Sequence, residues 1–362
     1  MGLAGGTEPP RKGDAGGLCN YSSTYDRGAT IQHWQLRDLV HCPSKDEELF
    51  CVYRHRTLRH DLASGKTEVV QELPFEPTSM TVAHGYVAAG GQNSQLDARR
   101  LGGGEVVYKG HCGGSVNNAL HIGRDASQQL RLFVCNNDDT IKVYGLQGGA
   151  LATVLRCPVA INYCALSPSG RHLVCVGDNR HTYLYQATPA AYRQCGVFTE
   201  ACDAGMCCAW SASGSMFASA SQDGSFPADA DQCNCRSFPP ISAGSMFASA
   251  SQDGSVAVWD HRSSALVAHF LTPLACRNVK FSPAPLDLLA FAEHRSRCHL
   301  VDCRMWDRQQ VLDVGGQDCE PDISGIAFSP SGRRLYVGTE GGLAAYDIDT
   351  MGRRGFPTYE LC

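Results

Sequence analysis

Residues 250–260 read ASQDGSVAVWD, in which a short β-type run passes through a Gln-Asp-Gly turn into an alternating apolar run. The preceding residues 244–249, GSMFAS, lengthen the first run. Alternating apolar residues predict a strand with one buried face, and two such runs joined by a tight polar turn pair as an antiparallel hairpin. This stretch therefore predicts a β-hairpin, and the rest of the chain repeats it.

The hairpin recurs with a period of about 40 to 45 residues, which is the period of a repeat protein. Radial repetition of small antiparallel sheets is the β-propeller arrangement. We therefore predict a flexible tail at 1–28 and an all-β, seven-bladed propeller with four-stranded antiparallel blades at 29–362. The units are marked by LSPSG at 166–170, WSASG at 210–214, FSPAP at 281–285, FSPSG at 328–332, and strand-turn-strand patterns at 49–62, 86–101 and 132–144.

One unit is interrupted by a direct duplication. GSMFASASQDGS at 214–225 recurs without change at 244–255. One copy alone fits as the strand between CCAWS at 207–211 and VAVWD at 256–260. We expect the second copy, Met246–Ser251, to form that strand, because a tight turn joins it directly to the next one. The region at about 225–254 is then an irregular duplicated insertion.

The amino-acid composition indicates which class of partner and which cellular compartment to expect. The 31 Lys and Arg against 36 Asp and Glu give a net charge of −5, without a long block of one sign, which disfavours nucleic acid and membrane surfaces. The N-terminus lacks the apolar core of an export signal. Nineteen cysteines without such a signal indicate an intracellular, reduced chain, cytoplasmic or nuclear. Cys51, Cys135 and Cys175 lie in apolar runs and are predicted to be buried as small hydrophobic residues.

The best unit resembles the WD40 family, since ASQDGSVAVWD ends in Trp259-Asp260. NNDDTIKVY at 136–144 is a weaker copy, with the family's Gly-His pair at Gly110-His111. In that family a turn Asp, a loop His and a strand Trp bond to one another. The resemblance therefore implies blade-stabilising pairs of Asp138 with His111 and of Asp253 with Trp259.

A narrower resemblance covers most of the chain. SPAPLDLLAFAEHRSRCHLVDCR at 282–304, HWQLRDLV at 33–40 and AAGGQNSQL at 88–96 are similar to fungal and plant WD-repeat proteins that carry a short C-terminal Asp-Leu-Leu segment of unknown function. This resemblance implies no particular activity.

Catalytic chemistry is not indicated. Catalysis needs several convergent polar groups, and no motif places them together, so we predict no catalytic residues, cofactor or metal. Cys298 and His299 would point to opposite faces of a strand, which argues against a metal cluster with His294 and Cys303. As an alternative, a propeller enzyme or small-molecule binder would use the central channel, with inner strands VNNALHI at 116–122 and AINYCALS at 160–167.

The pattern favours a non-enzymatic scaffold that binds other proteins and is monomeric by itself. Loops on a rigid sheet carry binding surfaces at little entropic cost. The turns between the second and third strands of the blades would lie on one rim of the disc. The candidate contact residues there are Arg54, His55, Arg56, Asn93, Asn137, Arg180, His294 and Arg295.

A second scaffold hypothesis rests on MFASASQDGSVAVWDHR at 246–262, which resembles the WD-x-R box in substrate receptors of cullin-RING ubiquitin ligases. That resemblance implies that Arg262 contacts the ligase adaptor, next to Trp259 and Asp260. Val301-Asp302-Cys303-Arg304 is a degenerate second copy. An arginine at a strand end can form charge-assisted bonds to a carboxylate or a carbonyl of the adaptor.

A propeller also needs a strand that closes its ring. The two candidates are TIQHWQL at 30–36 and FPTYEL at 356–361. In the WD40 family the N-terminal segment usually joins the final blade, and we expect the same closure here.

Overall fold

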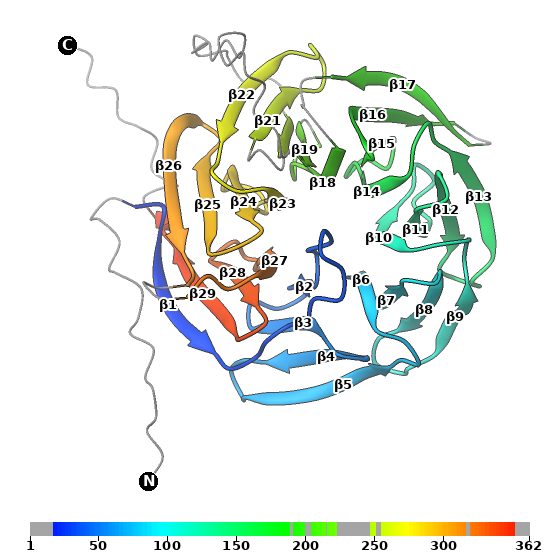
Figure 1. The fold of residues 1–362 in the computed structure, drawn as a ribbon, viewed down its shortest axis with the longest axis horizontal. Coiled ribbons are helices and arrows are strands. Elements are labelled where there is room, and N and C mark those ends of the chain that lie inside the picture. The colour runs from blue at the N-terminus through cyan, green and yellow to red at the C-terminus, as the bar shows by residue number, and fades with distance from the viewer. Residues whose placement is uncertain are drawn as a thin grey trace.

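The computed structural model describes residues 17–188, 191–199, 204–214, 216–222, 247–250, 255–315 and 319–351. Figure 1 shows small sheets arranged radially in a closed ring. Within the described residues every strand pair is antiparallel, six sheets have four strands each, and one further sheet has five. The all-β propeller with four-stranded antiparallel blades is confirmed. The expectation of seven such blades needs correction, since six have four strands and the sheet with the duplicated segment differs.

Each sheet has its innermost strand at the channel and its outermost strand at the rim (Figure 1), and the sheets follow one another around the ring in chain order. The first three sheets contain β2 (Val40–His41), β3 (Glu48–Tyr53), β4 (Arg56–Asp61) and β5 (Lys66–Glu72); β6 (Pro77–Ala83), β7 (Tyr86–Gly91), β8 (Gln95–Arg100) and β9 (Val106–His111); and β10 (Asn117–Arg124), β11 (Leu130–Asn136), β12 (Thr140–Gly145) and β13 (Leu151–Arg156). The next two contain β14 (Ile161–Leu166), β15 (His172–Gly177), β16 (Asn179–Ala187) and β17 (Tyr192–Phe198); and β18 (Ala204–Trp210), β19 (Met216–Gln222), β20 (Phe247–Ala250), β21 (Ser255–Asp260) and β22 (Leu266–Leu271). The last two contain β23 (Cys276–Phe281), β24 (Leu288–Glu293), β25 (Arg297–Asp302) and β26 (Met305–Asp313); and β27 (Ile323–Phe328), β28 (Arg334–Thr339), β29 (Leu343–Ile348) and β1 (Cys19–Tyr25).

Burial falls from the axis outward, and the sequence follows it. All six residues of the inner strand β14 are buried, whereas the outer strand β13 is largely exposed. An inner strand is covered on both faces by neighbouring blades, so it consists of continuous apolar or small residues. An outer strand has polar residues because water reaches it.

The ring is closed by β1, which pairs with β29 along Cys19–Tyr25. The predicted closure by the N-terminal segment is correct, but residues 30–36 do not provide it, and residues 356–361 lie outside the described residues. The tail predicted at 1–28 is therefore wrong over β1. The apolar sequence pattern of β1 is weak because an edge strand buries only one of its faces. In β1 that face includes Cys19, which is fully buried.

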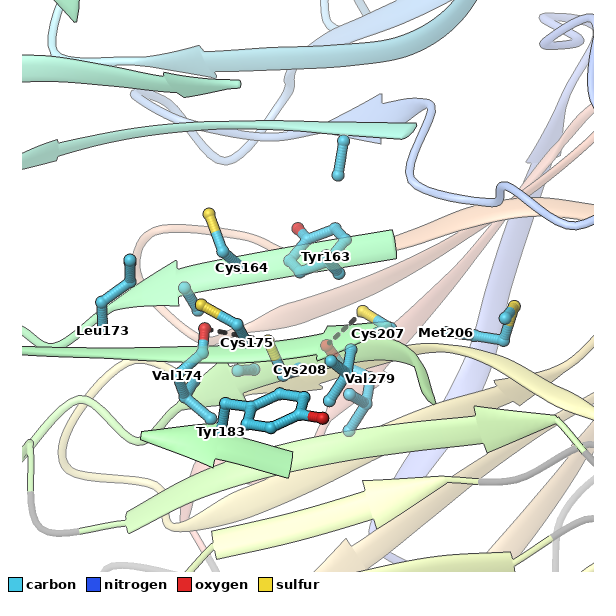
Figure 2. Close-up of a cluster of buried hydrophobic side chains, with 14 of the residues drawn as sticks. Tyr163, Cys164, Leu173, Val174, Cys175, Tyr183, Met206, Cys207, Cys208 and Val279 are labelled. Carbon is cyan, nitrogen blue, oxygen red and sulfur yellow. Dashed lines mark hydrogen bonds between the residues drawn. The ribbon is translucent and has the colours of Figure 1, made fainter. Parts of the chain in front are cut away.

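Cysteines fill the space between blades. Cys51, Cys135 and Cys175 are at most 4% exposed, which confirms their predicted burial. Figure 2 shows adjacent cysteines of β18 on opposite faces, with Cys208 Sγ 3.6 Å from the Val174 carbonyl oxygen and Cys207 Sγ 3.9 Å from that of Val279. No cysteine in the described part of the chain forms a disulfide bond. Burial raises the pKa of Cys207 to about 12, so this thiol stays protonated and acts as a small apolar group.

Both copies of the duplicated segment pair with β21 in one register, because Phe217 and Phe247 each lie opposite Trp259. A strand has two edges, and β22 occupies the other edge of β21. The first copy, β19, also pairs with β18, so it lies between β18 and β21. This corrects the expectation that the second copy fills that place. A turn in which Gly214 N donates to the Ser211 carbonyl oxygen at 2.9 Å brings the first copy back to β18.

Deleting residues 226–255 is expected to leave the fold intact. The deletion joins the first copy directly to VAVWD and restores GSMFASASQDGSVAVWD with one copy. Competition between identical strands for one edge is then removed. The shortened chain should melt at the same temperature as the full chain or higher, measured by calorimetry. Deleting residues 216–245 would give the identical amino-acid sequence, because the two copies are the same and lie 30 residues apart, so one deletion variant tests both copies. A molten product would contradict the prediction.

Candidate interaction site at the central channel

Residues 31–39, here called the channel segment, run into the centre of the ring, where Figure 1 shows a blue loop. Contacts with strands of different blades hold it there. Leu39 N donates to the Ser324 carbonyl oxygen of β27 at 3.1 Å, and Asn278 Nδ2 of β23 donates to the Arg37 carbonyl oxygen at 2.6 Å. The segment predicted as a possible closing strand is therefore a plug in the channel.

Asp38 anchors the channel segment. Its carboxylate lies 2.9 Å from Lys280 Nζ and accepts hydrogen bonds from the Tyr163 hydroxyl and, at 3.3 Å, from Asn278 Nδ2. The Asp38 side chain is 12% exposed and the Lys280 side chain 24%. Lys280 Nζ also lies 5.6 Å from the Tyr163 ring centroid. One carboxylate thus joins the plug to two blades that are far apart in the sequence.

The surroundings keep both members of this pair charged. Burial by itself would raise the pKa of Asp38, but Lys280, His41 and the Tyr163 hydrogen bond together lower it below its usual value. Burial would lower the pKa of Lys280, but Asp38 raises it above its usual value. The contact is therefore an ion pair at neutral pH.

A β-bulge at the same place in six inner strands lines the channel. In each strand the pairing register skips one residue, so that two residues oppose one on the neighbouring strand. A bulge leaves the extra residue outside the ladder and redirects its side chain. The extra residues are Thr78, Asn118, Asn162, Met206, Arg277 and Ser324. Of these six positions, Arg277 alone carries a charge.

The channel segment leaves little room in the channel. The cavity beside it measures about 10 Å³ and is lined by five of the bulge residues together with Leu36, Arg37 and Asp38. That volume holds about one water molecule. This closed channel gives no support to the small-molecule alternative.

The candidate rim residues lie in the turns between second and third strands. Arg54 has a positive φ of 52° in the β3–β4 turn, and Arg56 pairs with Glu72 at 2.9 Å. Arg180 is exposed at the start of β16. Arg295, in the β24–β25 turn, pairs with Asp322 at 3.3 Å, and His294 N donates to the Ala275 carbonyl oxygen. His55, Asn93 and Asn137 occupy the same turns of their blades.

The WD-x-R residues lie at the opposite ends of their strands, so the structure does not bring the two candidate sets together. Trp259 and Asp260 end β21, and Arg262 follows with an exposed side chain. Asp260 Oδ1 accepts a bond from Arg262 N at 2.7 Å. The Arg304 guanidinium instead binds its own neighbour Asp302 at 3.2 Å. Rim residues and WD-x-R residues therefore face opposite sides of the disc.

The expected blade-stabilising pairs differ from the family pattern. His111 is exposed at the end of β9, and Asp138 instead accepts hydrogen bonds from Thr140 Oγ1 and, at 2.8 Å, from Lys142 Nζ. The local Thr and Lys satisfy the turn carboxylate, so His111 is not needed there. Asp253 lies outside the described residues. Trp259 is 5% exposed and packs on Phe198 with ring centroids 5.5 Å apart.

The His and Cys group of blade β23–β26 is built differently from a metal site. His299 Nε2 lies 2.8 Å from Glu293 Oε1, and its Nδ1 lies 2.7 Å from Gln309 Nε2. In the residues that the structure describes, no group of three His, Cys, Asp or Glu side chains could hold a metal ion. The described part of the chain also has no helix long and apolar enough to cross a membrane.

Sequence reasoning missed Arg37, Asp38, Arg277 and Lys280. A signal was present, because Arg37-Asp38 interrupts the apolar Leu36 and Leu39, and CRNVKF at 276–281 carries two cations in a buried inner strand. Charges in an otherwise apolar strand are rarely buried without a role.

Fold and channel together define a β-propeller. The family described as "WD domain, G-beta repeat" matches residues 196–226 and 232–260, and each match contains one copy of the duplicated segment. The family described as "Uncharacterised protein domain (DUF2415)" matches residues 275–313, the region of the narrower resemblance. Both expected resemblances are thereby confirmed.

Two similar proteins cover nearly the whole chain. "Uncharacterized protein C4G3.03" of Schizosaccharomyces pombe is 29% identical over 341 residues, which span 91% of each chain. A chain in the "Crystal Structure of Mitotic Checkpoint Complex" has a TM-score of 0.71 at 13% identity and covers 96% of this chain and 98% of its own. The second likeness shows a shared propeller fold. Neither similar protein supports the ligase-adaptor hypothesis.

Proposed function

We propose that this chain is a protein-interaction scaffold that binds other proteins through the face carrying the turns between second and third strands. The plugged channel is the observation that carries the proposal. The channel segment occupies the centre of the ring beside a cavity of only about 10 Å³, so we assign partner binding to the turns around the channel and not to its interior. A rigid ring can hold such turns for a partner at little entropic cost.

Other observations fit this proposal. The similar chain of known structure belongs to a crystallised protein complex, according to its title. The free cysteines in the described residues suit a reducing compartment, so we place the scaffold inside the cell. The opposite face of the disc, which carries Arg262, provides the control variant for testing the proposal.

Charge reversal on each face tests the proposal. The rim variant is Arg54→Glu/Arg180→Glu, and the control on the opposite face is Lys66→Glu/Arg262→Glu. All four side chains are exposed, and both variants change the net charge by the same amount. Proteins captured from the source cells by the wild-type chain should fall at least fivefold with the rim variant, quantified by mass spectrometry. The control variant should capture them as the wild type does.

The opposite pattern would overturn the choice of face, because loss with Lys66→Glu/Arg262→Glu alone would assign binding to the WD-x-R side. If both variants capture these proteins as well as the wild type does, with unchanged melting temperatures, binding through the charged residues of either face is contradicted.

A further inference from the structure

Two buried arginines meet at the channel mouth without a carboxylate partner. Arg37 of the channel segment is 6% exposed, and Arg277, the charged bulge residue of β23, is 7% exposed. Both line the same small cavity. Among the described residues, neither guanidinium has a carboxylate within ion-pair distance, and the Nε atoms of both lack a hydrogen-bond partner. Burying like charges side by side is costly unless an anion compensates them.

Backbone carbonyls satisfy part of each guanidinium. Arg37 Nη1 donates to the His33 carbonyl oxygen at 2.7 Å and to that of Leu36 at 3.2 Å. Arg277 Nη1 donates to the Trp34 carbonyl oxygen. Carbonyls are neutral, so these bonds hold the side chains in place without balancing their charge.

Asp322 and Glu340, the carboxylates whose charges act on Arg37, form their own bonds to other groups. Asp322 pairs with Arg295 at 3.3 Å, and Glu340 accepts a bond from Ile31 N at 3.1 Å. Burial, followed by the charge of Arg37, lowers the pKa of Arg277 to about 10, which is still well above neutral. The mouth therefore stays positively charged at physiological pH.

Neighbouring elements carry further buried polar atoms without a hydrogen-bond partner in the described part of the chain. His294 Nδ1 and Ser296 Oγ come from the β24–β25 turn, and Ser324 Oγ comes from β27. The backbone joins these elements, since Ile323 N donates to the His294 carbonyl oxygen at 3.0 Å. Burial lowers the pKa of the His294 imidazole, and the charges of Arg277 and Arg37 lower it further, which places this ring near both arginines.

The exposed Trp34 lies beside Arg277. Its side chain is 59% exposed, and its ring lies 5.5 Å from the Arg277 guanidinium carbon. An exposed tryptophan beside a buried arginine is the kind of pair that dominates binding energy at protein interfaces.

We propose that Arg37 and Arg277 form an anion-binding site at the channel mouth, which takes a carboxylate or phosphate group carried by a segment of a partner protein. Because the cavity of about 10 Å³ is too small for such a group, binding displaces the exposed Trp34 side chain outward. Two guanidinium groups provide the planar donors that such groups bind in pairs. Trp34 packs against the apolar part of the same segment. This inference rests on the proposed scaffold function and names the chemistry of its partner.

Anion titration of the full chain tests the site. The probes are inorganic phosphate, N-acetyl-phosphoserine amide and N-acetyl-glutamate amide, at ionic strength held constant with sodium chloride so that screening does not change. Fluorescence should respond saturably to at least one probe, and Trp34→Phe should remove that response. The probe that binds most tightly distinguishes phosphate from carboxylate recognition. Arg37→Gln and Arg277→Gln should each weaken its binding at least tenfold, whereas the rim controls Arg54→Gln and Arg180→Gln should stay within twofold.

A structural role for the arginines would give a different result. Arg37→Gln relieves repulsion from Arg277, so its melting temperature without anion should equal or exceed that of the wild type. Arg37→Lys keeps the charge but not the planar fork, and it should bind more weakly than the wild type and more tightly than Arg37→Gln. No saturable response to any probe, or equal weakening by the rim controls, overturns the anion site. Loss of partner capture with the rim variant alone would then leave the scaffold proposal standing, whereas anion binding without partner capture would overturn the scaffold.

Discussion

Asp38→Ala is expected to lower the free energy of unfolding by about 2 to 3 kcal/mol, because it removes charge-assisted hydrogen bonds and leaves the Lys280 ammonium, which is 24% exposed, without its counter-ion. The channel segment loses its main anchor in the same step, since Tyr163 and Asn278 also donate to this carboxylate. Denaturant unfolding followed by circular dichroism measures the change. The double variant Asp38→Ala/Lys280→Met removes both charges and should be more stable than Asp38→Ala alone.

The two pKa shifts determine the pH range over which Asp38 and Lys280 stabilise the fold. Asp38 has a lowered pKa in the fold, so its contribution is present above the unfolded pKa of about 3.9 and is lost as pH falls through the folded value. Lys280 has a raised pKa, so its contribution is present below about 10.4 and is lost as pH rises through the folded value. The stability gap between wild type and Asp38→Ala should be flat from about pH 5 to 9 and shrink on either side. A gap that is absent throughout this range would contradict an anchoring ion pair.

The blades could be predicted from the sequence because each is built from neighbouring hairpins. Turn chemistry and alternation carry the information for a contact such as that between β15 and β16, which one short turn connects. The β18–β22 sheet was predicted less well for the same reason. Two identical segments have the same local preference, and their order in the sheet depends on which hairpin each forms.

The channel could not be predicted in the same way. Asp38 meets Tyr163 and Lys280 across 125 and 242 residues of sequence. A lone Arg-Asp pair in a sequence usually indicates a solvated turn, and only closure of the ring turns it into a buried anchor. The bulges pose the same problem, since Asn118 and Arg277 occupy equivalent positions but share no residue type.

The closing strand was mislocated for a related physical reason. The candidate TIQHWQL at 30–36 contains the apolar Ile31, Trp34 and Leu36, whereas CNYSSTY at 19–25 has no aliphatic residue and was counted in the predicted tail. An edge strand needs little apolar surface, because one edge and much of its side-chain area stay in water. The channel segment needs more, because it is surrounded by inner strands.

Removing residues 1–26 is expected to have the second large effect, a loss of about 5 kcal/mol or more. The deletion removes the β1–β29 ladder and the burial of Leu18 and Cys19, which are 2% and 0% exposed. Burial of one leucine side chain stabilises a fold by about 1.5 to 3 kcal/mol, and each ladder hydrogen bond adds about 1 kcal/mol. Gln310 also loses its bonds to the Leu18 and Cys19 amides, at 2.6 and 2.9 Å.

A shorter deletion separates the strand from the residues before it. Removing residues 1–16 leaves every described contact of β1 in place, so the melting temperature should stay within about 1 °C of the full chain. In the longer deletion, amide exchange should rise first along β29, because its outer edge becomes unpaired and open to water. A synthetic peptide of residues 17–27 should slow that exchange again by pairing with the open edge. Unchanged exchange at β29 after removal of residues 1–26 would show that β1 does not close the ring.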